Sequence, residues 1–448
     1  MKARVVLGAA IVAASAVACQ LLIGLEDPQE SPPDSGVPPV DLCNPVVPPE
    51  RPDATDNPNE SKQLGFAALH HIYFAADGDG GAPEGGSQGY NLDGTCTCSP
   101  RGLRTGSSCA AANPGTDCDF NGGVDNSLVR VSFKYAAAGI KLDDALLVNK
   151  RIATGVATLI LHLSNYNGKL DDPAVGFGFA DAFGSEYPYD HPDDPFCAAQ
   201  DAGPRDAAAP RDAGPRDGGD AGDAEPVYRT PIWNGCDAWQ VSQQRTIFEP
   251  SERAGFIPTL RIDSAYVRDG KLVARGTVPL NLRLGLFNLP INDLVVTADV
   301  VLLDQNSQPV PFGSDRAFRY RLANGIFAGR IRAQDLSFVL GGIPRGPGAP
   351  PICDPRDPLS ALLFKTVKDE VCAGRDIAQI PKFDNQSPLV ACDALSVALP
   401  FDADPAYMGN RVPDTAFPPV MGGCDSLLDA GSDAAPVIAD AAGYFSCP

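Results

Sequence analysis

The stretch Phe256-Ile-Pro-Thr-Leu-Arg-Ile-Asp-Ser-Ala-Tyr-Val-Arg-Asp-Gly-Lys-Leu-Val-Ala-Arg-Gly-Thr-Val278 contains two strand-like runs, residues 256–267 and 271–278. Both runs contain β-branched side chains, and the first also contains Phe256 and Tyr266, all of which favour strands. The dipeptide Asp269-Gly270 separates them, and this pair is typical of a two-residue hairpin turn. The stretch therefore predicts two antiparallel strands joined by a tight hairpin.

Further strand-like runs lie on both sides of this hairpin. They cover residues 66–74, 157–163, 175–179, 294–303, 318–322 and 326–331, and Asn324-Gly325 predicts a second hairpin turn between the last two. Helices are expected over residues 128–135, 142–153 and 359–371. The predicted fold class is mainly β or α+β, an antiparallel sheet or β-sandwich with a few helices and many disulfides.

The N-terminus has the features of a bacterial lipoprotein export signal. Two basic residues precede an apolar run from Val5 to Val17, and small residues lead to Cys19. We expect residues 1–18 to be removed and Cys19 to carry acyl chains that anchor the protein to the outer membrane, at the cell surface or the periplasmic face. The alternative is ordinary cleavage that leaves Cys19 as a free thiol.

Composition divides the rest of the chain. Residues 19–60 are rich in Pro and acidic side chains and are expected to form an extended tether. Residues 61–448 are expected to form a single domain. Within it, residues 198–226 repeat Asp-Ala-Gly-Pro-Arg-Asp and have almost no large apolar side chains, so we expect a disordered insert.

Cysteine parity supports export to an oxidising compartment. Of 13 cysteines, twelve remain once Cys19 is set aside, and we expect all twelve to form disulfides. They are Cys43, Cys96, Cys98, Cys109, Cys118, Cys197, Cys236, Cys353, Cys372, Cys392, Cys424 and Cys447.

The spacing of these cysteines predicts three groups. Cys197 and Cys236 flank the insert closely, so a disulfide between them would clamp its base. The four cysteines between residues 96 and 118 are expected to form local crosslinks, with zinc as a weaker alternative. The five from residue 353 onward are expected to link the C-terminal third.

The net charge of −21 argues against a nucleic-acid partner. Binding to nucleic acid requires clustered Lys and Arg that neutralise phosphates, and no such cluster is present.

One segment has the oxygen-rich spacing of a calcium loop. Asp117, Asp119, Asn121 and Asp125 occupy loop positions 1, 3, 5 and 9, with Gly122 at position 6 for the sharp turn. Calcium takes six to eight oxygen ligands, and such a loop supplies several. Position 12 lacks the Glu of an EF-hand, so a shorter calcium loop fits better. The alternative is an Asx-rich turn in which Asp125 or Asn126 caps the following helix.

Two functional classes remain open. The first is a cell-surface lipoprotein of binding or structural type, stabilised by Ca²⁺, that contacts a protein or a glycan through aromatics such as Tyr228, Trp233 and Trp239. The second is a secreted carbohydrate-active hydrolase that uses a carboxylate pair, which the sequence does not identify.

Strict strand alternation places His70 and His71 on opposite faces, so we expect that they do not share a site. The first class is preferred because no catalytic motif is found.

Several tracts resemble landmarks of a family of uncharacterised myxobacterial surface lipoproteins. They are Asn121-Gly-Gly-Val-Asp-Asn-Ser-Leu128, Tyr266-Val-Arg-Asp-Gly-Lys-Leu-Val273, Gly325-Ile-Phe-Ala-Gly-Arg330 and Cys392-Asp-Ala-Leu-Ser396. The resemblance spans roughly residues 60 to 424. It implies export and a surface location, and it implies no activity. The insert is a departure from the family pattern.

Overall fold

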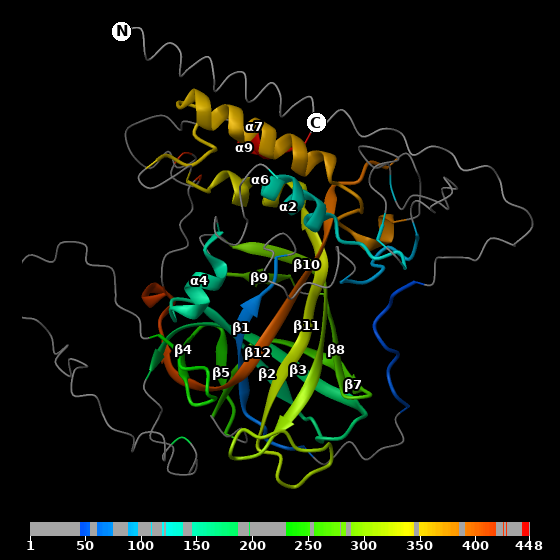
Figure 1. Cartoon of the computed structure of the whole chain (residues 1–448), viewed down its shortest axis with the longest axis vertical. Helices are drawn as coiled ribbons and strands as arrows, with labels where there is room; N and C mark the ends of the chain where they lie inside the picture. The colour runs from blue at the N-terminus through cyan, green and yellow to red at the C-terminus, as the bar shows by residue number, and fades with distance from the viewer. Residues whose placement is uncertain are drawn as a thin grey trace, which may run out of the picture. The chain divides into compact units, whose positions relative to one another are not determined.

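Eight antiparallel strands close into a barrel in the computed structural model of the chain (Figure 1). The residues described are 45–53, 61–74, 88–96, 109, 119–120, 122–137, 146–186, 197, 230–250, 255–277, 279–283, 288–344, 349–384, 390–417, 424, 427 and 441–447. All of them belong to one unit, residues 43–448.

The barrel strands follow one another around the ring in chain order. They are β1 (Phe66–Ile72), β2 (Thr158–Ser164), β3 (Asp172–Glu186), β7 (Leu260–Arg268), β8 (Lys271–Gly276), β10 (Leu289–Leu303), β11 (Arg319–Arg332) and β12 (Ala394–Val412). Each pairs antiparallel with the next, and β12 pairs antiparallel with β1 to close the ring. This is an up-and-down barrel. The predicted mainly β, antiparallel fold class is therefore confirmed.

Four shorter strands lie outside the closed ring of the barrel. β4 (Ala238–Ser242) pairs antiparallel with β3 and parallel with β12. β5 (Thr246–Phe248) and β6 (Phe256–Pro258) form a small separate hairpin, and β9 (Leu280–Leu282) pairs with β10.

Helices gather at one end of the barrel, drawn at the top in Figure 1. They include α2 (Ser127–Ala137), which contacts β12, and α6 (Ala333–Gly341), which contacts β10, β11 and α7 (Pro358–Ala373). The other helical segments of the described residues are α4 (Val148–Ala153), α9 (Ala441–Phe445) and the short 3-10 helices η1 (Pro381–Phe383) and η2 (Asp414–Ala416). The predictions of helices over 128–135 and 359–371 are confirmed. Within the described part of 142–153, the helix covers 148–153. No described helix is long and apolar enough to cross a bilayer.

Alternating side chains fill the barrel. On β10 they are Leu294, Val296, Ala298, Val300 and Leu302, which are nearly fully buried in one continuous core. This core extends from the barrel interior to α6 and α7. The period of two explains why the 294–303 run is recognisable as a strand.

Of the two predicted hairpin turns, one is confirmed and one is wrong. Asp269 and Gly270 have positive φ values of 50° and 75° and join β7 to β8. Asn324 and Gly325 lie inside β11, where they form a β-bulge. Asn324 has the left-handed conformation, φ 49°, that is also typical of a turn. Because the partner strands continue on both sides, this conformation only bends the strand.

The disulfides confirm some of the cysteine grouping and correct the rest. Cys197 pairs with Cys236 at the base of the insert, as predicted. Cys353 pairs with Cys424 and Cys372 with Cys447, within the C-terminal third.

Cys392 does not follow the predicted grouping, because it pairs with Cys109 across 283 positions. The predicted local crosslinking of Cys109 is therefore wrong. Cys392 lies just before β12, so this disulfide fixes Cys109 near the start of that strand. Cys96 is also disulfide-bonded. Cys19, Cys43, Cys98 and Cys118 lie outside the described residues, as does the insert 198–226.

The domain begins earlier than predicted. Residues 45–53 belong to the expected tether, yet Val46 donates a backbone hydrogen bond to Gly122 and the hydroxyl of Tyr266 donates to the carbonyl of Pro49. Burial of Pro48 adds to this attachment. The boundary placed at residue 61 is therefore too late, because a backbone that is bonded to the domain does not act as a free tether.

Candidate functional site

A polar groove lies on the outer wall of the barrel, where β1 meets β12 and β11. Its volume is about 530 Å³, within the usual range of ligand pockets. The residues that line it, named here the outer-wall groove, are His70, His71, Tyr73, Arg321, Leu322, Ala323, Asp402 and Asp404. Most of these carry ionisable or hydrogen-bonding side chains, which makes the groove the strongest candidate for a functional site.

A β-bulge in β1 places both histidines in this groove. Leu69 opposes Ala403 and His71 opposes Asp402, so His70 is an extra residue on its strand. As a result, His70 and His71 are both partly exposed, while Leu69 and Ile72 face the core. The prediction that the two histidines lie on opposite faces is therefore wrong. A bulge breaks the strict alternation on which it depended.

His70 is held by two contacts. Its Nδ1 lies 2.5 Å from Oδ2 of Asp404, and its ring stacks on Trp233 with centroids 4.2 Å apart and planes within 15°. An ionised carboxylate only accepts hydrogen bonds, so this contact places the proton of a neutral imidazole on Nδ1. The other nitrogen, Nε2, then has a free lone pair and makes no hydrogen bond to any described residue.

Asp402 lies beside this pair, and both of its carboxylate oxygens already accept hydrogen bonds. One carboxylate oxygen accepts a hydrogen bond from the hydroxyl of Tyr73 at 2.6 Å, and the other accepts from the backbone N–H of Asn324 at 3.1 Å. The hydrogen bond to Asp402 raises the pKa of Tyr73 to about 12. Tyr73 is therefore a neutral donor that fixes the wall of the groove.

Arg321 supplies the positive charge of the groove. It faces outward from β11, between the inward-facing Tyr320 and Leu322. Its guanidinium is exposed and makes no hydrogen bond or ion pair with any residue that the structure describes. The five donors of Arg321 are thus available to a carboxylate or a phosphate.

The two groove carboxylates fit poorly as a glycosidase pair. Asp402 and Asp404 share one face of β12, which places their Cα atoms about 7 Å apart. Such a pair requires one carboxyl group that gives a proton and one free carboxylate. Here Asp402 accepts a hydrogen bond on each oxygen, and Asp404 is committed to His70. Binding and His-centred chemistry fit the arrangement better.

Sequence reasoning missed Tyr73, Arg321, Asp402 and Asp404. A weak signal exists in the alternation of Phe401, Ala403 and the two aspartates, which marks a strand with carboxylates on one face. No local motif links these residues to His70, because the groove forms only when the first and last barrel strands pair.

Of the predicted calcium ligands, Asp119 and Asp125 are described, and Asp117 and Asn121 lie outside the described residues. Asp125 is 1% exposed, and its Oδ2 accepts backbone hydrogen bonds from Leu92 at 2.6 Å and Asp93 at 3.3 Å. Burial, then the charges of Asp93 and Asp119, raise the pKa of Asp125 well above its ordinary value. Within the described residues, no three acidic, His or Cys side chains form a metal-binding group.

The alternative capping role of this segment is wrong. Asn126 precedes α2, but its amide bonds to the backbone of Ala398 on β12 and to the carbonyl of Gln88. Asp125 bonds to residues 92 and 93 instead of the helix. Both side chains therefore fasten the start of α2 to its surroundings, because tertiary partners compete for the same polar atoms.

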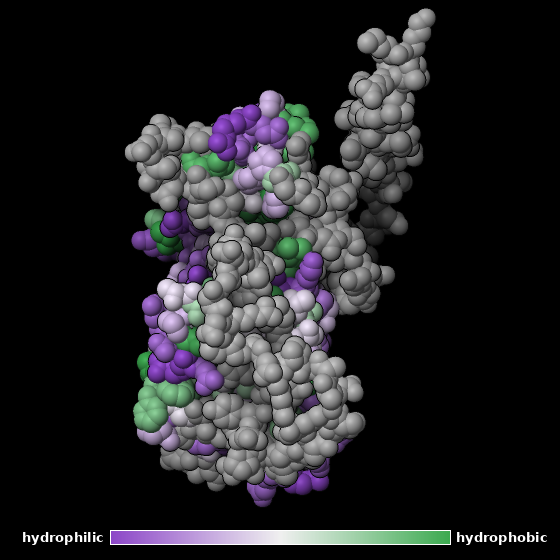
Figure 2. All heavy atoms as spheres, turned by 90° about the vertical axis from the view of Figure 1, so that its left-hand side faces the viewer, coloured by the Kyte–Doolittle hydropathy of each residue, from purple (hydrophilic) through white to green (hydrophobic). Residues whose placement is uncertain are grey.

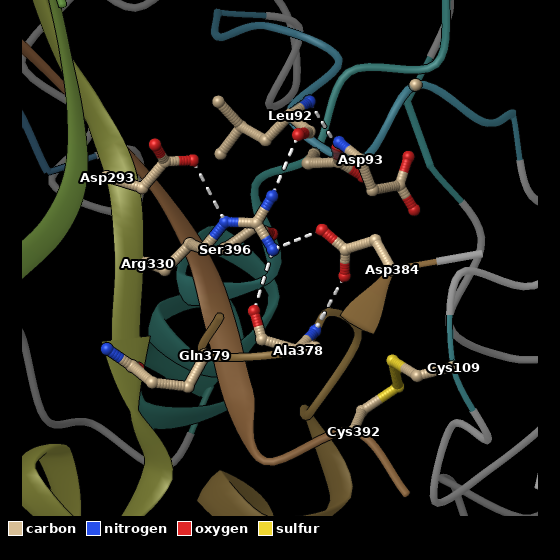
Figure 3. A network of polar contacts seen from close by, with 12 residues as sticks. Leu92, Asp93, Cys109, Asp293, Arg330, Ala378, Gln379, Asp384, Cys392 and Ser396 are labelled. Atoms are coloured by element: carbon tan, nitrogen blue, oxygen red, sulfur yellow. Dashed lines mark hydrogen bonds and ion pairs between the residues drawn. A yellow bond between two sulfur atoms is a disulfide. The ribbon is translucent and has the colours of Figure 1, made fainter. Parts of the chain in front are cut away.

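A second polar network surrounds Arg330, which is fully buried (Figure 3). Its guanidinium lies 2.5 Å from Oδ2 of Asp384 and 3.2 Å from Oδ2 of Asp293, and it donates to the carbonyls of Ala378 and Leu92 at 2.7 and 2.8 Å. These partners come from strand β10, from the segment before β12 and from the segment around Leu92. Because all of these partners are parts of the protein and Arg330 is fully buried, the network has a structural role.

An apolar cavity of about 30 Å³ lies between the barrel end and α6. Its lining is entirely apolar and includes Ile72, Leu128, Leu289 and Leu340. A volume near that of one water molecule is too small for an acyl chain.

Exposed apolar side chains do not form one docking surface on the face in Figure 2, where the described apolar residues are separate patches among hydrophilic ones. The most exposed, Phe248, Leu362 and Ile232, belong to different elements. Of the predicted contact aromatics, Trp239 is fully buried, Trp233 is half-buried beside the groove, and Tyr228 lies outside the described residues. The groove therefore remains the principal candidate.

Comparisons of the chain with protein-family models, with curated proteins and with solved structures found no match. The resemblance to surface lipoproteins stays a prediction.

Proposed function

We propose that this chain is an exported surface lipoprotein of the binding type, anchored through acylated Cys19, and that the outer-wall groove holds its ligand. The observation that carries the proposal is the combination of unused groups in one groove. Among the residues that the structure describes, the guanidinium of Arg321 has no partner, and neither has Nε2 of His70 beside the carboxylate of Asp404.

These groups define the chemistry of the ligand. The guanidinium of Arg321 fits a carboxylate or phosphate group. His70 and Asp404 accept hydrogen bonds from a hydroxyl or an amine. The net charge of −21 repels polyanions. Salt screens the negative charges that lie far from the groove, so a single acidic group inside the groove is attracted to the guanidinium of Arg321. The ligand class is therefore a small acid that also carries a hydroxyl or amine, such as an acidic sugar unit of a glycan.

The test is fluorescence titration with glucuronate, and with glucose as the uncharged match. The chain has two tryptophans, of which Trp239 is buried and Trp233 stacks on His70, so binding in the groove should change the emission of Trp233. We expect a saturable change with glucuronate, little with glucose, and loss of binding in Arg321→Gln. Arg316→Gln, an exposed arginine outside the groove, is the matched control. Equal binding of both sugars, or unchanged binding in Arg321→Gln, would contradict the proposal.

Export and anchoring have a separate test. Intact mass of protein extracted from membranes should show an acylated Cys19 and no residues 1–18. A mature chain with an unmodified Cys19 thiol would instead support ordinary cleavage.

Calcium binding by the loop at residues 117–125 is also proposed. Its support is the spacing of oxygen ligands in the sequence and the mutual repulsion of Asp93, Asp119 and Asp125, which a cation would relieve.

A further inference from the structure

His70, Asp404 and Trp233 form an arrangement that binding alone does not require. Asp404 orients the imidazole through Nδ1, and Trp233 fixes the plane of the ring. The bulge of β1 points the imidazole out of the wall and into the groove. A histidine fixed at Nδ1 by a carboxylate, with a free Nε2 in an open groove, has the geometry of a general base.

The groove also provides a place for an anionic substrate. Arg321 lines the same groove and has no partner in the described part of the protein. Among the residues that line the groove there is no Ser, Thr or Cys, so the nucleophile that fits is water. A water molecule activated by His70 would attack a group held beside the guanidinium of Arg321.

We propose that the outer-wall groove hydrolyses carboxylic esters that carry an acidic group, with His70 as the general base, Asp404 as its positioning residue and Arg321 as the anchor for the acid. This inference rests on the ligand class of the proposed function and adds a reaction to it.

The reaction is balanced without any further reactant. Nε2 of His70 takes a proton from water as the water oxygen bonds to the ester carbonyl carbon. The bond from that carbon to the alcohol oxygen then breaks, and the proton on Nε2 moves to the leaving oxygen. The products are an acid and an alcohol, and the imidazole returns to its starting state.

The experiment uses two chromogenic esters with the same leaving group. The mono-4-nitrophenyl ester of adipic acid carries a carboxylate, and 4-nitrophenyl acetate is the uncharged match. We expect the wild-type protein to favour the anionic ester in kcat/KM, and Arg321→Gln to abolish this preference through KM. Arg316→Gln should retain it.

Variants of the dyad separate catalysis from packing. His70→Ala should lower kcat on the order of 100-fold or more, and added imidazole should restore part of it. Asp404→Asn should lower kcat with little change in KM, and the pH profile of kcat/KM should change because the tautomer is no longer fixed. Thermal unfolding of each variant, compared with wild type, shows whether the fold is intact.

The outcomes distinguish this inference from the binding proposal. Glucuronate binding without ester hydrolysis above the buffer rate would overturn the catalytic inference and leave the binding proposal standing. Hydrolysis that is unchanged in a folded His70→Ala variant would also overturn it. Hydrolysis that requires His70 in a protein that does not bind glucuronate would support the inference and contradict the proposed ligand.

Discussion

Nδ1 of His70 lies 2.5 Å from Oδ2 of Asp404, although 334 positions separate the two residues in the chain. The contact exists because β12 returns to pair with β1 and closes the barrel. Bulges in β1 and β11 flank Asp402 on its two sides, at His70 and at Asn324. The polar groove is thus built at the seam between the first and last strands of the barrel, where bulges redirect side chains outward.

Arg330 should be essential for stability. Arg330→Met removes the buried partner of Asp384, whose side chain is 5% exposed, and leaves the carbonyls of Ala378 and Leu92 without this donor. Breaking a buried ion pair in this way costs about 3–5 kcal/mol. The measurement is the free energy of unfolding from urea titration. Arg321→Met, on the same strand but at an exposed side chain with no partner among the described residues, is the matched control and should change it by less than about 0.5 kcal/mol. Similar losses in both variants would contradict the structural role of the network.

Gly325 should tolerate no side chain. A Cβ at this position would lie 2.4 Å from Cζ of Phe401, which is fully buried. Gly325→Ala is therefore expected to cost about 1–3 kcal/mol of unfolding free energy, because the bulge and the ring cannot both stay in place. In the double variant with Phe401→Leu, the total loss should be smaller than the sum of the single losses. Additive losses would show that the ring is not the obstacle.

Asp181 should make stability depend on pH. Burial raises its pKa to about 6 in the folded protein, whereas the ordinary value is 3.8. Between pH 4 and 6 the folded state holds a proton that the unfolded state has lost, so this group's contribution to stability falls as pH rises through that window. The complete effect is at most about 3 kcal/mol.

The measurement for Asp181 is a series of urea titrations at pH 4, 5, 6 and 7.5. Asp181→Asn should be more stable than wild type at pH 7.5 and close to it at pH 4. Asp315→Asn, at a fully exposed side chain, serves as the control and should follow wild type. If the free energy of unfolding differs between Asp181→Asn and wild type by the same amount at every pH, titration of Asp181 is not the source of the pH dependence.

Calcium should bind with a measurable heat if the loop at 117–125 is a site. Calorimetric titration of the purified protein should show saturable binding that is lost in Asp119→Ala, because each carboxylate ligand contributes to a hard-cation site. Glu370→Ala, at a helix position far from the loop in the sequence, is the control. No heat in wild type would leave these carboxylates with a structural role only.

The sequence by itself determined the elements whose conformation depends only on residues that are close together in the chain. Asp269-Gly270 specified a hairpin because both positions adopt positive φ. The period of two along β10 specified a strand with one buried face, and the spacing of Cys197 and Cys236 around the insert indicated their disulfide. The signal-like N-terminus and the cysteine parity predict an exported protein, and the mass measurement tests that prediction.

Only the tertiary structure decided what depends on strands that are distant in the chain. Asn324-Gly325 has the same local preference as a turn, yet pairing with β10 and β12 makes it a bulge. His70 joins Asp404 because barrel closure pairs β1 with β12, and Cys109 joins Cys392 across 283 positions of the chain. Which strands pair is determined by burial of the whole core, a sum over many contacts that no short segment encodes, and the groove exists only where that pairing places its residues.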